Sequence, residues 1–277
     1  MRRFFLQNSL GDRRDLQTRG KLFFHAPTGL GFSDTNTYAP VEGFFVRTYR
    51  EPVQGSVAGE LVFGSYADYK DFADWVFSGY DLALVYAPDG IEYLCDVDIV
   101  TLSKGELARG VLVCPVAMSA KTPWYKATSV NMVIAPPAAE KDWSRLPFAL
   151  PARFAAGRID SALEIAPAGH MPAAIRVEAA GPLVNPRITL RDIQGQTLGL
   201  LDLAGVDIAE GETLVFSTRF GEVGVNKGDT DLLDKIDLGN NSFFSVPQNR
   251  ASTLILSSAS TITTAAVVRL YEYYRTV

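Results

Sequence analysis

Two stretches of the sequence decide the fold class: EYLCDVDIVTL at residues 92–102 and VLVCPVAMSA at residues 111–120. In each, apolar and polar side chains alternate with a period of two, which is the pattern of a half-buried β-strand. One face of the first stretch carries Tyr93, Cys95, Val97 and Ile99. One face of the second carries Leu112, Cys114, Val116 and Met118. The alternation predicts two strands that turn these apolar faces toward one core.

We expect these two strands to form a hairpin with the loop Lys104-Gly105, because glycine favours two-residue hairpin loops. That register sets Cys95 directly opposite Cys114. Opposed Cβ atoms lie about 4.5–5.5 Å apart, which is too far for a relaxed disulfide, whose mean is about 3.8 Å. The prediction is therefore two buried, reduced thiols packed side by side. A longer loop running to Gly110 is the alternative, and it would shift the register.

A short helix is expected to interrupt the β pattern, between strands at Val41–Arg50 and Gly55–Phe63 and a later strand at Leu82–Tyr86. Ser65 is placed to cap its start, and Ser78-Gly79 ends it. Four apolar side chains fall on one face of the helix: Tyr69, Phe72, Ala73 and Val76. This stripe predicts a surface that packs on the core, and not a cofactor site.

The second half of the sequence is almost wholly β in pattern. Further strands are expected at Ala174–Ala179, Arg187–Ile193, Leu198–Leu203, Thr213–Thr218, Ser252–Ser257 and Val267–Tyr274. Short strands separated by Gly, Pro and Asn turns are typical of a β-sandwich or jelly roll. The Pro-rich segment 134–141 reads as a linker, with the boundary between about 135 and 155. We therefore predict two domains, residues 1–140 and residues 141–277.

The composition excludes several classes of function. With 277 residues and 47% hydrophobic residues, the chain is globular and long enough for two cores. The net charge is -5, and no stretch is basic enough for sequence-specific nucleic-acid binding. No apolar run approaches the roughly 18 residues that span a bilayer, so no membrane segment is expected. The basic residues of the first 21 positions form either a solvated arm or an arm that contacts another subunit.

Candidate catalytic and metal-binding residues are few. His25 and His170 lie in loop contexts without a second ligand at metal-binding spacing, so structural or surface roles are favoured. Asp96 and Asp98 share one face of a strand, as glycosidase carboxylates do, but a solvated strand face explains them better. The run 229–234 departs from a calcium loop at its fifth and sixth positions. The sequence thus predicts no catalytic, cofactor-binding or metal-binding residues, and no enzyme.

The order of several segments resembles the distal tail proteins of siphophages, which are phages with long, non-contractile tails. In the first half the matching segments are Gly55–Phe63, Tyr66–Phe72, Tyr86–Tyr93, Lys104–Glu106 and Thr122–Tyr125. In the second half they are Asn185–Leu190, Asn241–Pro247 and Leu270–Tyr274. The sequence departs from the family at Gln248-Asn249-Arg250, where a glycine-containing turn is usual.

This resemblance implies an N-terminal β domain that closes into a ring, commonly a homohexamer, and an outward-facing C-terminal galectin-like β-sandwich. The implied partners are the tail-tube protein, the tail-associated hub protein and the tape-measure protein. In some relatives the outer domain also carries a receptor-binding protein. The implied function is a structural connection between the tail tube and the tail-tip adsorption apparatus of the virion. Assembly is expected in the host cytoplasm, with no cofactor. We expect residues 1–140 alone to make the ring.

Two alternatives remain open at this point. One is a carbohydrate-binding, lectin-like module of the tail tip, since a galectin-like sandwich can be adapted to bind glycans. Residues 151–277 contain no tryptophan, a favoured stacking surface for sugars, so we expect at best weak glycan affinity. Trp124-Tyr125 could stack on a sugar if exposed, although core or interface packing is commoner. The other alternative is a fragment of a tail-associated glycosidase or peptidase.

Overall fold

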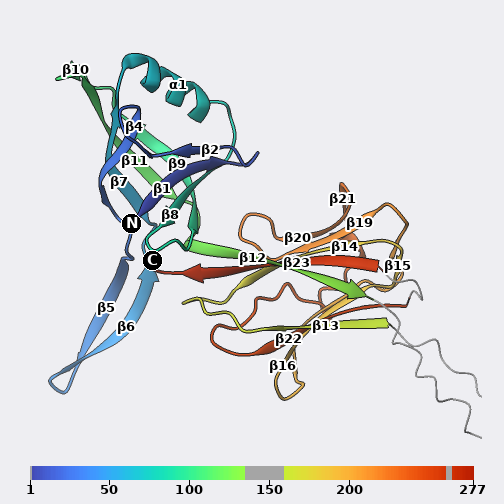
Figure 1. Cartoon of the computed structure of the whole chain (residues 1–277). Helices are drawn as coiled ribbons and strands as arrows, with labels where there is room; N and C mark the ends of the chain where they lie inside the picture. The colour runs from blue at the N-terminus through green and yellow to red at the C-terminus, as the bar shows by residue number, and fades with distance from the viewer. Residues whose placement is uncertain (1, 135–158, 260–263) are drawn as a thin grey trace, which may run out of the picture. The chain divides into compact units, whose positions relative to one another are not determined.

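The computed structural model describes residues 2–134, 159–259 and 264–277 (Figure 1). The chain folds into two compact units. The first unit is Met1–Lys126 together with Tyr273–Val277, and the second is Ala127–Glu272. Strands dominate both units, and α1 (Tyr66–Val76) is the one α-helix in the described part of the chain, so the predicted mainly β class is confirmed.

The first unit is an antiparallel sheet that closes on itself. Its strand order is β3 (Gln17–Thr18), β4 (Leu22–Thr28), β7 (Ser56–Phe63), β11 (Val111–Ala120), β9 (Tyr93–Leu102), β8 (Leu82–Ala87), β1 (Arg3–Asn8) and β2 (Arg13–Asp15). Leu16 lies between β2 and β3 and joins the two ends of this sheet. Its N–H donates to the Phe4 carbonyl at 3.0 Å, and its carbonyl accepts from the Phe24 N–H at 2.7 Å. The result is a small barrel with Leu16 fully buried.

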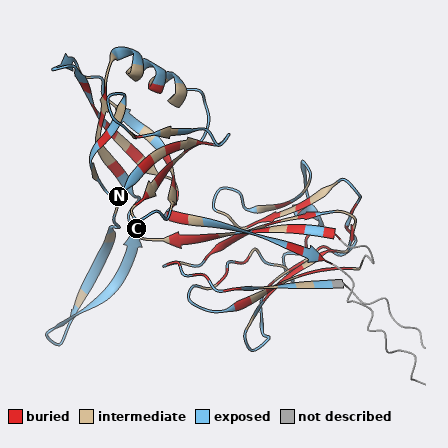
Figure 2. Cartoon of the chain, in the orientation of Figure 1, coloured by how far each residue is buried: buried red, intermediate tan, exposed pale blue. Residues whose placement is uncertain are grey.

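Helix α1 packs on the core of this barrel, as its apolar stripe predicts. Ser65 caps the helix by accepting the Asp68 N–H at 3.1 Å. Phe72 is buried, and its ring lies 5.5 Å from the ring of Phe63 on β7. The ring of Tyr69 also meets that of Phe63 edge-on, with the ring centroids 5.4 Å apart. Figure 2 shows that buried residues gather on the inner faces of the barrel strands, with the solvent side of α1 exposed.

The strands β9 and β11 pair as predicted, but the predicted register is wrong. A two-residue loop at 104–105 would place Val97 opposite Leu112, whereas Val97 lies opposite Ala120, eight residues further along β11. The extra chain forms β10 (Leu107–Ala108), which pairs back on the start of β11. Between them, Arg109 and Gly110 both have positive φ, 53° and 79°, as a type I′ turn requires. The longer loop that runs to Gly110 is therefore the correct alternative.

The predicted state of the cysteines is confirmed even though their pairing is not. Cys114 lies opposite Leu61 of β7, and not opposite Cys95. Both thiols are free and at most 1% exposed, and both belong to the core of the first unit. Burial, together with the nearby charge of Asp96, raises the pKa of Cys95 to about 12. These thiols are inert apolar fillers of the barrel.

The second unit contains two antiparallel sheets that share one apolar core. One sheet has the order β21 (Thr230–Asp231), β20 (Gly224–Lys227), β19 (Thr213–Ser217), β14 (Ala174–Ala180) and β23 (Thr264–Tyr274). The other has the order β13 (Ile159–Ile165), β22 (Ser252–Ser258), β16 (Arg187–Asp192) and β17 (Thr197–Asp202). The small pair β15 (Leu183–Val184) and β18 (Asp207–Ile208) and the 3₁₀ turn η2 (Leu233–Lys235) complete it. Apolar side chains from both sheets meet in one cluster, as in a β-sandwich.

The sequence of the second unit is inserted into that of the first. The strand β12 (Trp124–Ile134) begins in the core of the first unit with Trp124 and ends in the core of the second with Ile134. The strand β23 returns, and its last residue, Tyr274, packs on the first core. This grouping differs from a single division at residue 140, because Tyr273–Val277 lie with the first unit. Except for Ile134, the predicted linker 134–141 lies outside the described residues.

Candidate assembly interface

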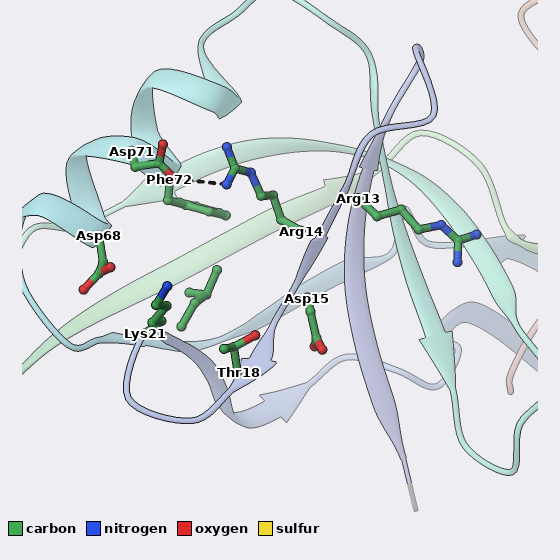
Figure 3. A pocket seen from close by; sticks show the side chains of 9 residues that line it. Arg13, Arg14, Asp15, Thr18, Lys21, Asp68, Asp71 and Phe72 are labelled. Atoms are coloured by element: carbon green, nitrogen blue, oxygen red, sulfur yellow. Dashed lines mark hydrogen bonds and ion pairs between the residues drawn. The ribbon is translucent and has the colours of Figure 1, made fainter.

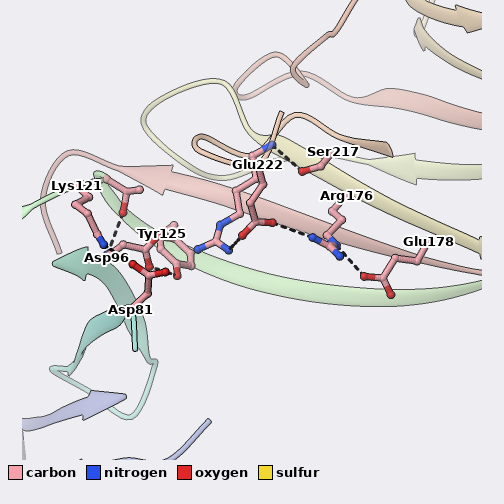
Figure 4. Close-up of polar contacts among 10 residues, drawn as sticks. Asp81, Asp96, Lys121, Tyr125, Arg176, Glu178, Ser217 and Glu222 are labelled. Carbon is pink, nitrogen blue, oxygen red and sulfur yellow. Dashed lines mark hydrogen bonds and ion pairs between the residues drawn. The ribbon is translucent and has the colours of Figure 1, made fainter. Parts of the chain in front are cut away.

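The carboxylates that sequence reasoning weighed for catalysis are held separately in structural contacts (Figure 4). The Asp96 carboxylate accepts a hydrogen bond from the Tyr125 hydroxyl at 2.8 Å. Asp98 forms an ion pair with Lys121 at 3.2 Å. The hydrogen bond from Lys121 to Asp81, at 2.8 Å, outweighs desolvation and raises the pKa of this lysine. These contacts explain both aspartates as structural partners: Asp96 fastens β9 to β12, and Asp98 fastens it to Lys121 just before β12.

The remaining predicted candidates also have structural explanations. His25 is exposed and lies 3.4 Å from Glu60, and His170 is exposed. Within the run 229–234, Asp231 accepts the Leu233 N–H at 2.9 Å, which fits the interpretation as an acidic loop or one helical turn. In the described part of the chain, no three His, Cys, Asp or Glu side chains are grouped to hold a metal ion. No helix there is long and apolar enough to cross a membrane.

The basic N-terminal segment is part of the barrel and is not a free arm. Arg13 pairs with both carboxylate oxygens of Glu92 at 2.9 Å. Arg14 donates to Asp71 at 3.0 Å (Figure 3). Its guanidinium also lies 5.6 Å from the ring centroid of Trp75. A hollow of about 310 Å³ beside Arg14 is lined by basic and acidic side chains together, including Lys21. Because these opposite charges compensate each other, the hollow has no marked preference for a charged ligand.

The most unusual surface of the first unit is a β-hairpin that stands apart from the barrel. It consists of β5 (Asp34–Val41) and β6 (Phe44–Pro52), which form a two-stranded sheet of their own. All nine residues of β6 are exposed, and Phe44 and Phe45 at its tip are each 75% exposed (Figure 2). The sequence predicts a strand at Val41–Arg50 but gives no indication of its partner β5 or of its exposure.

One face of this hairpin is mainly apolar, and a β-bulge extends it. Directly opposed residues share a face, and the pairs on this face are Val41 with Phe44, Ala39 with Val46 and Thr37 with Tyr49. The register shift between Thr37 and Tyr38 leaves Thr48 out of the pairing. As a result, Tyr49 joins the face of Val46, although the two residues are three positions apart in β6. The bulge thus extends the apolar face by one aromatic side chain.

A hairpin of this kind is unfavourable in water by itself. Two-stranded hairpins are at best marginally stable alone, and exposed contiguous apolar surface marks contact sites or aggregation-prone surface. Its unpaired strand edges add backbone groups that a neighbouring chain could satisfy. We therefore regard the apolar face of β5 and β6 as the candidate assembly interface of the described residues.

The base of the hairpin is fixed by a nearly buried carboxylate. The Asp34 side chain is 7% exposed and accepts hydrogen bonds from Arg50 at 2.6 Å and from Arg275 at 3.0 Å. Burial by itself would raise the pKa of Asp34. The hydrogen bonds and positive charges of the two arginines outweigh burial and lower the pKa below its ordinary value. Asp34 is therefore held in its ionised form.

Known proteins share both the first unit and the fold of the whole chain. The family model for the N-terminal domain of distal tail proteins matches residues 3–121. No curated protein has a significant sequence match to the chain. A chain from the phage P2 baseplate in its activated conformation is similar over 100% of both chains, with 16% identity and a TM-score of 0.68. The SPP1 Dit protein covers 97% of this chain and 98% of its own, with 8% identity and a TM-score of 0.59.

The closed barrel with its helix, the inserted sandwich and the exposed hairpin together make a mainly β protein of two units. Residues 3–121 match the N-terminal domain of distal tail proteins, and the whole chain shares the fold of the phage P2 baseplate chain and of SPP1 Dit. The resemblance seen in the sequence is confirmed.

Proposed function

We propose that the chain is a distal tail protein that forms a homo-oligomeric ring, commonly a hexamer, through its first unit, at the tip of the virion tail. The observation that carries the proposal is the β5–β6 hairpin, whose apolar face has no covering partner among the described residues of the chain. A ring subunit needs a large surface buried between copies, and it needs no active site. The proposal assigns the protein no catalytic step.

The ring would connect the tail-tube protein to the tail-associated hub protein, with the tape-measure protein in its lumen. The SPP1 Dit protein is described as a paradigm of the hub adsorption apparatus in phages that infect Gram-positive bacteria, and it supports this assignment by its fold. The second unit would serve as a galectin-like outer platform that can carry a receptor-binding protein. Assembly in the host cytoplasm requires neither a membrane nor a cofactor.

Glycan binding is the less favoured function for the second unit. Sugars stack on exposed aromatic rings, and Phe220, 68% exposed, is the one strongly exposed aromatic among the described residues of this unit. Trp124 and Tyr125 are each 5% exposed, so neither offers a stacking surface. A glycan array that showed binding tighter than about 10 μM, roughly -7 kcal/mol, would favour the lectin instead.

The ring is tested with variants of the full chain that make the apolar face polar while retaining β propensity. Phe44→Thr/Val46→Thr changes two side chains of that face. The matched control is Phe77→Thr/Val100→Thr, which changes equally exposed residues of the same unit outside the hairpin. Native mass spectrometry should show a multiple of 30.2 kDa for the parent chain and the control, and lower masses for the hairpin variant. A hairpin variant that keeps the parent mass would contradict the proposal.

A further inference from the structure

The hairpin has very few attachments to the rest of the first unit. Its own side-chain hydrogen bonds remain within it: Thr48 donates to the Thr37 carbonyl at 3.2 Å, and Tyr49 donates to Glu51 at 2.8 Å. In the described part of the chain, the bond from Arg275 to Asp34 is the one side-chain polar contact that leaves β5 and β6. The direction of the hairpin therefore depends on its base.

The segment that supplies Arg275 is firmly packed on the first unit. The ring of Tyr273 lies 6.2 Å from that of Tyr125, and the ring of Tyr274 meets that of Tyr93 edge-on at 5.2 Å. Val277 packs on the apolar core beyond them. Arg275 is thus presented from a fixed backbone on both sides.

The two arginines that bind Asp34 connect it to different parts of the structure. Arg50 belongs to β6, so its bond to Asp34 joins the two strands of the hairpin to each other. Arg275 belongs to the segment after β23, so its bond joins the hairpin to the body of the unit. Loss of Arg275 would free the base of the hairpin from the body of the unit, and a two-stranded hairpin without that support is only marginally stable and opens more often.

We propose that Arg275, held in place by the packed segment Tyr273–Val277, is the residue that positions the β5–β6 hairpin for assembly. The link to assembly rests on the proposed ring. The positioning itself rests only on the contacts of Asp34. Because Arg275 follows β23, the hairpin is held by a part of the chain that has already passed through the second unit. The assembly surface is therefore complete only when residues more than 200 positions apart have come together.

The first experiment measures positioning without assembly. In the Phe44→Thr/Val46→Thr background of the full chain, trypsin cleavage after Arg47 reports how often the hairpin opens, because local cleavage follows the population of the open form. Arg275→Met should raise the cleavage rate by roughly two- to tenfold, the range for one lost charge-assisted hydrogen bond at a partly exposed place. Arg275→Lys should recover most of the protection. The matched control Arg13→Met removes an equally well-formed ion pair, with Glu92, and should leave the rate unchanged.

The second experiment measures assembly in the parent chain. Arg275→Met should raise the protein concentration needed for half-assembly, and Arg13→Met should not. If Arg275→Met leaves the rate of cleavage after Arg47 unchanged, the positioning role is overturned, whatever oligomer masses are measured. Increased cleavage with unchanged assembly would overturn its importance for the interface. Failure of the proposed ring can be distinguished from failure of the positioning role. In that case the Phe44→Thr/Val46→Thr protein keeps the mass of the parent chain.

Discussion

At the scale of single residues, burial makes the two cysteine thiols unreactive. Cys95 is 1% exposed and Cys114 is fully buried, and the Cys95 thiol donates to the Thr122 carbonyl at 3.2 Å. Thiolate is the form that reacts with labelling reagents, and burial disfavours it. The sequence indicates these roles correctly because both cysteines lie on the apolar side of alternating strands.

We expect both cysteines to resist labelling in the native protein. With the pKa of Cys95 at about 12, roughly one thiol in ten thousand is ionised at pH 8. The native assembly should therefore show almost no reaction with a thiol reagent over minutes, and two equivalents should react after unfolding in urea. Rapid labelling of the folded protein would show that the barrel core is open.

Acidification should loosen the base of the hairpin. The pKa of Asp34 is lowered in the folded protein, so the stabilisation from its ionised form is present above the ordinary value of 3.8 and is lost as the pH falls below it. The groups that face Asp34, Arg50 and Arg275, keep their charge throughout this range.

This loosening can be followed with pepsin, which works at low pH and cleaves next to aromatic residues such as Phe44 and Phe45. Cleavage at the hairpin tip should increase between pH 4 and pH 2.5 in the parent chain. In Asp34→Asn the rate should be high already at pH 4 and should change less with pH, because no carboxylate titrates there. Identical pH profiles for the two proteins would contradict the role of Asp34.

At the scale of elements, alternation determines which faces are buried but does not determine register. The true pairing of Val97 with Ala120 and the predicted pairing with Leu112 differ by an even number of residues, so both bury the same faces. The register of β9 and β11 is set instead by the turn at Arg109 and Gly110. The residues around this turn show no regular alternation of apolar and polar side chains. Helix α1 was predictable because its cap and its stripe are local.

Substitutions at this turn should change stability in opposite directions. Arg109→Asn places the preferred Asn-Gly pair in the turn and should stabilise the protein by about 0.5 kcal/mol. Gly110→Ala forces a residue with a Cβ atom into φ 79° and should destabilise it by about 1 kcal/mol. Both changes can be measured by urea unfolding. If neither has an effect while Gly105→Ala does, the turn is not where the structure has it.

The hairpin was the element that sequence reasoning could not find. DTNTYAPV at residues 34–41 lacks regular alternation and contains Pro40. The sequence also does not indicate that Phe44 and Phe45 are exposed, because apolar side chains are usually buried. Their exposure is a property of the single chain, and in the ring that we propose the same side chains would be covered. The candidate interface therefore could not be predicted from local patterns in the sequence.

At the scale of the whole molecule, the insertion of the second unit determines which pieces fold together. The sequence indicated two β units but not the return of Tyr273–Val277, because a contact between Tyr274 and Tyr93 leaves no local pattern. A ring-forming unit built from residues 1–140 would lack this segment, and with it Arg275.

We expect a protein of residues 1–126 joined by a short Gly/Ser linker to residues 273–277 to be more stable than residues 1–134 alone. The linker can be short because the rings of Tyr125 and Tyr273 lie 6.2 Å apart. The segment contributes Tyr273, 8% exposed, and the packing of Tyr274 and Val277. Burial of two to three such side chains corresponds to about 3 kcal/mol or more, which thermal unfolding should resolve. Equal melting temperatures would mean that the segment adds nothing to the first unit.

The native mass of the purified full chain tests the account most directly. A ring subunit should give a closed oligomer at micromolar concentration, and for the expected hexamer the mass is six times the 30.2 kDa of the chain. The Phe44→Thr/Val46→Thr protein should shift toward single chains under the same conditions. A mass of 30.2 kDa for the parent chain at all accessible concentrations would contradict the ring that we propose.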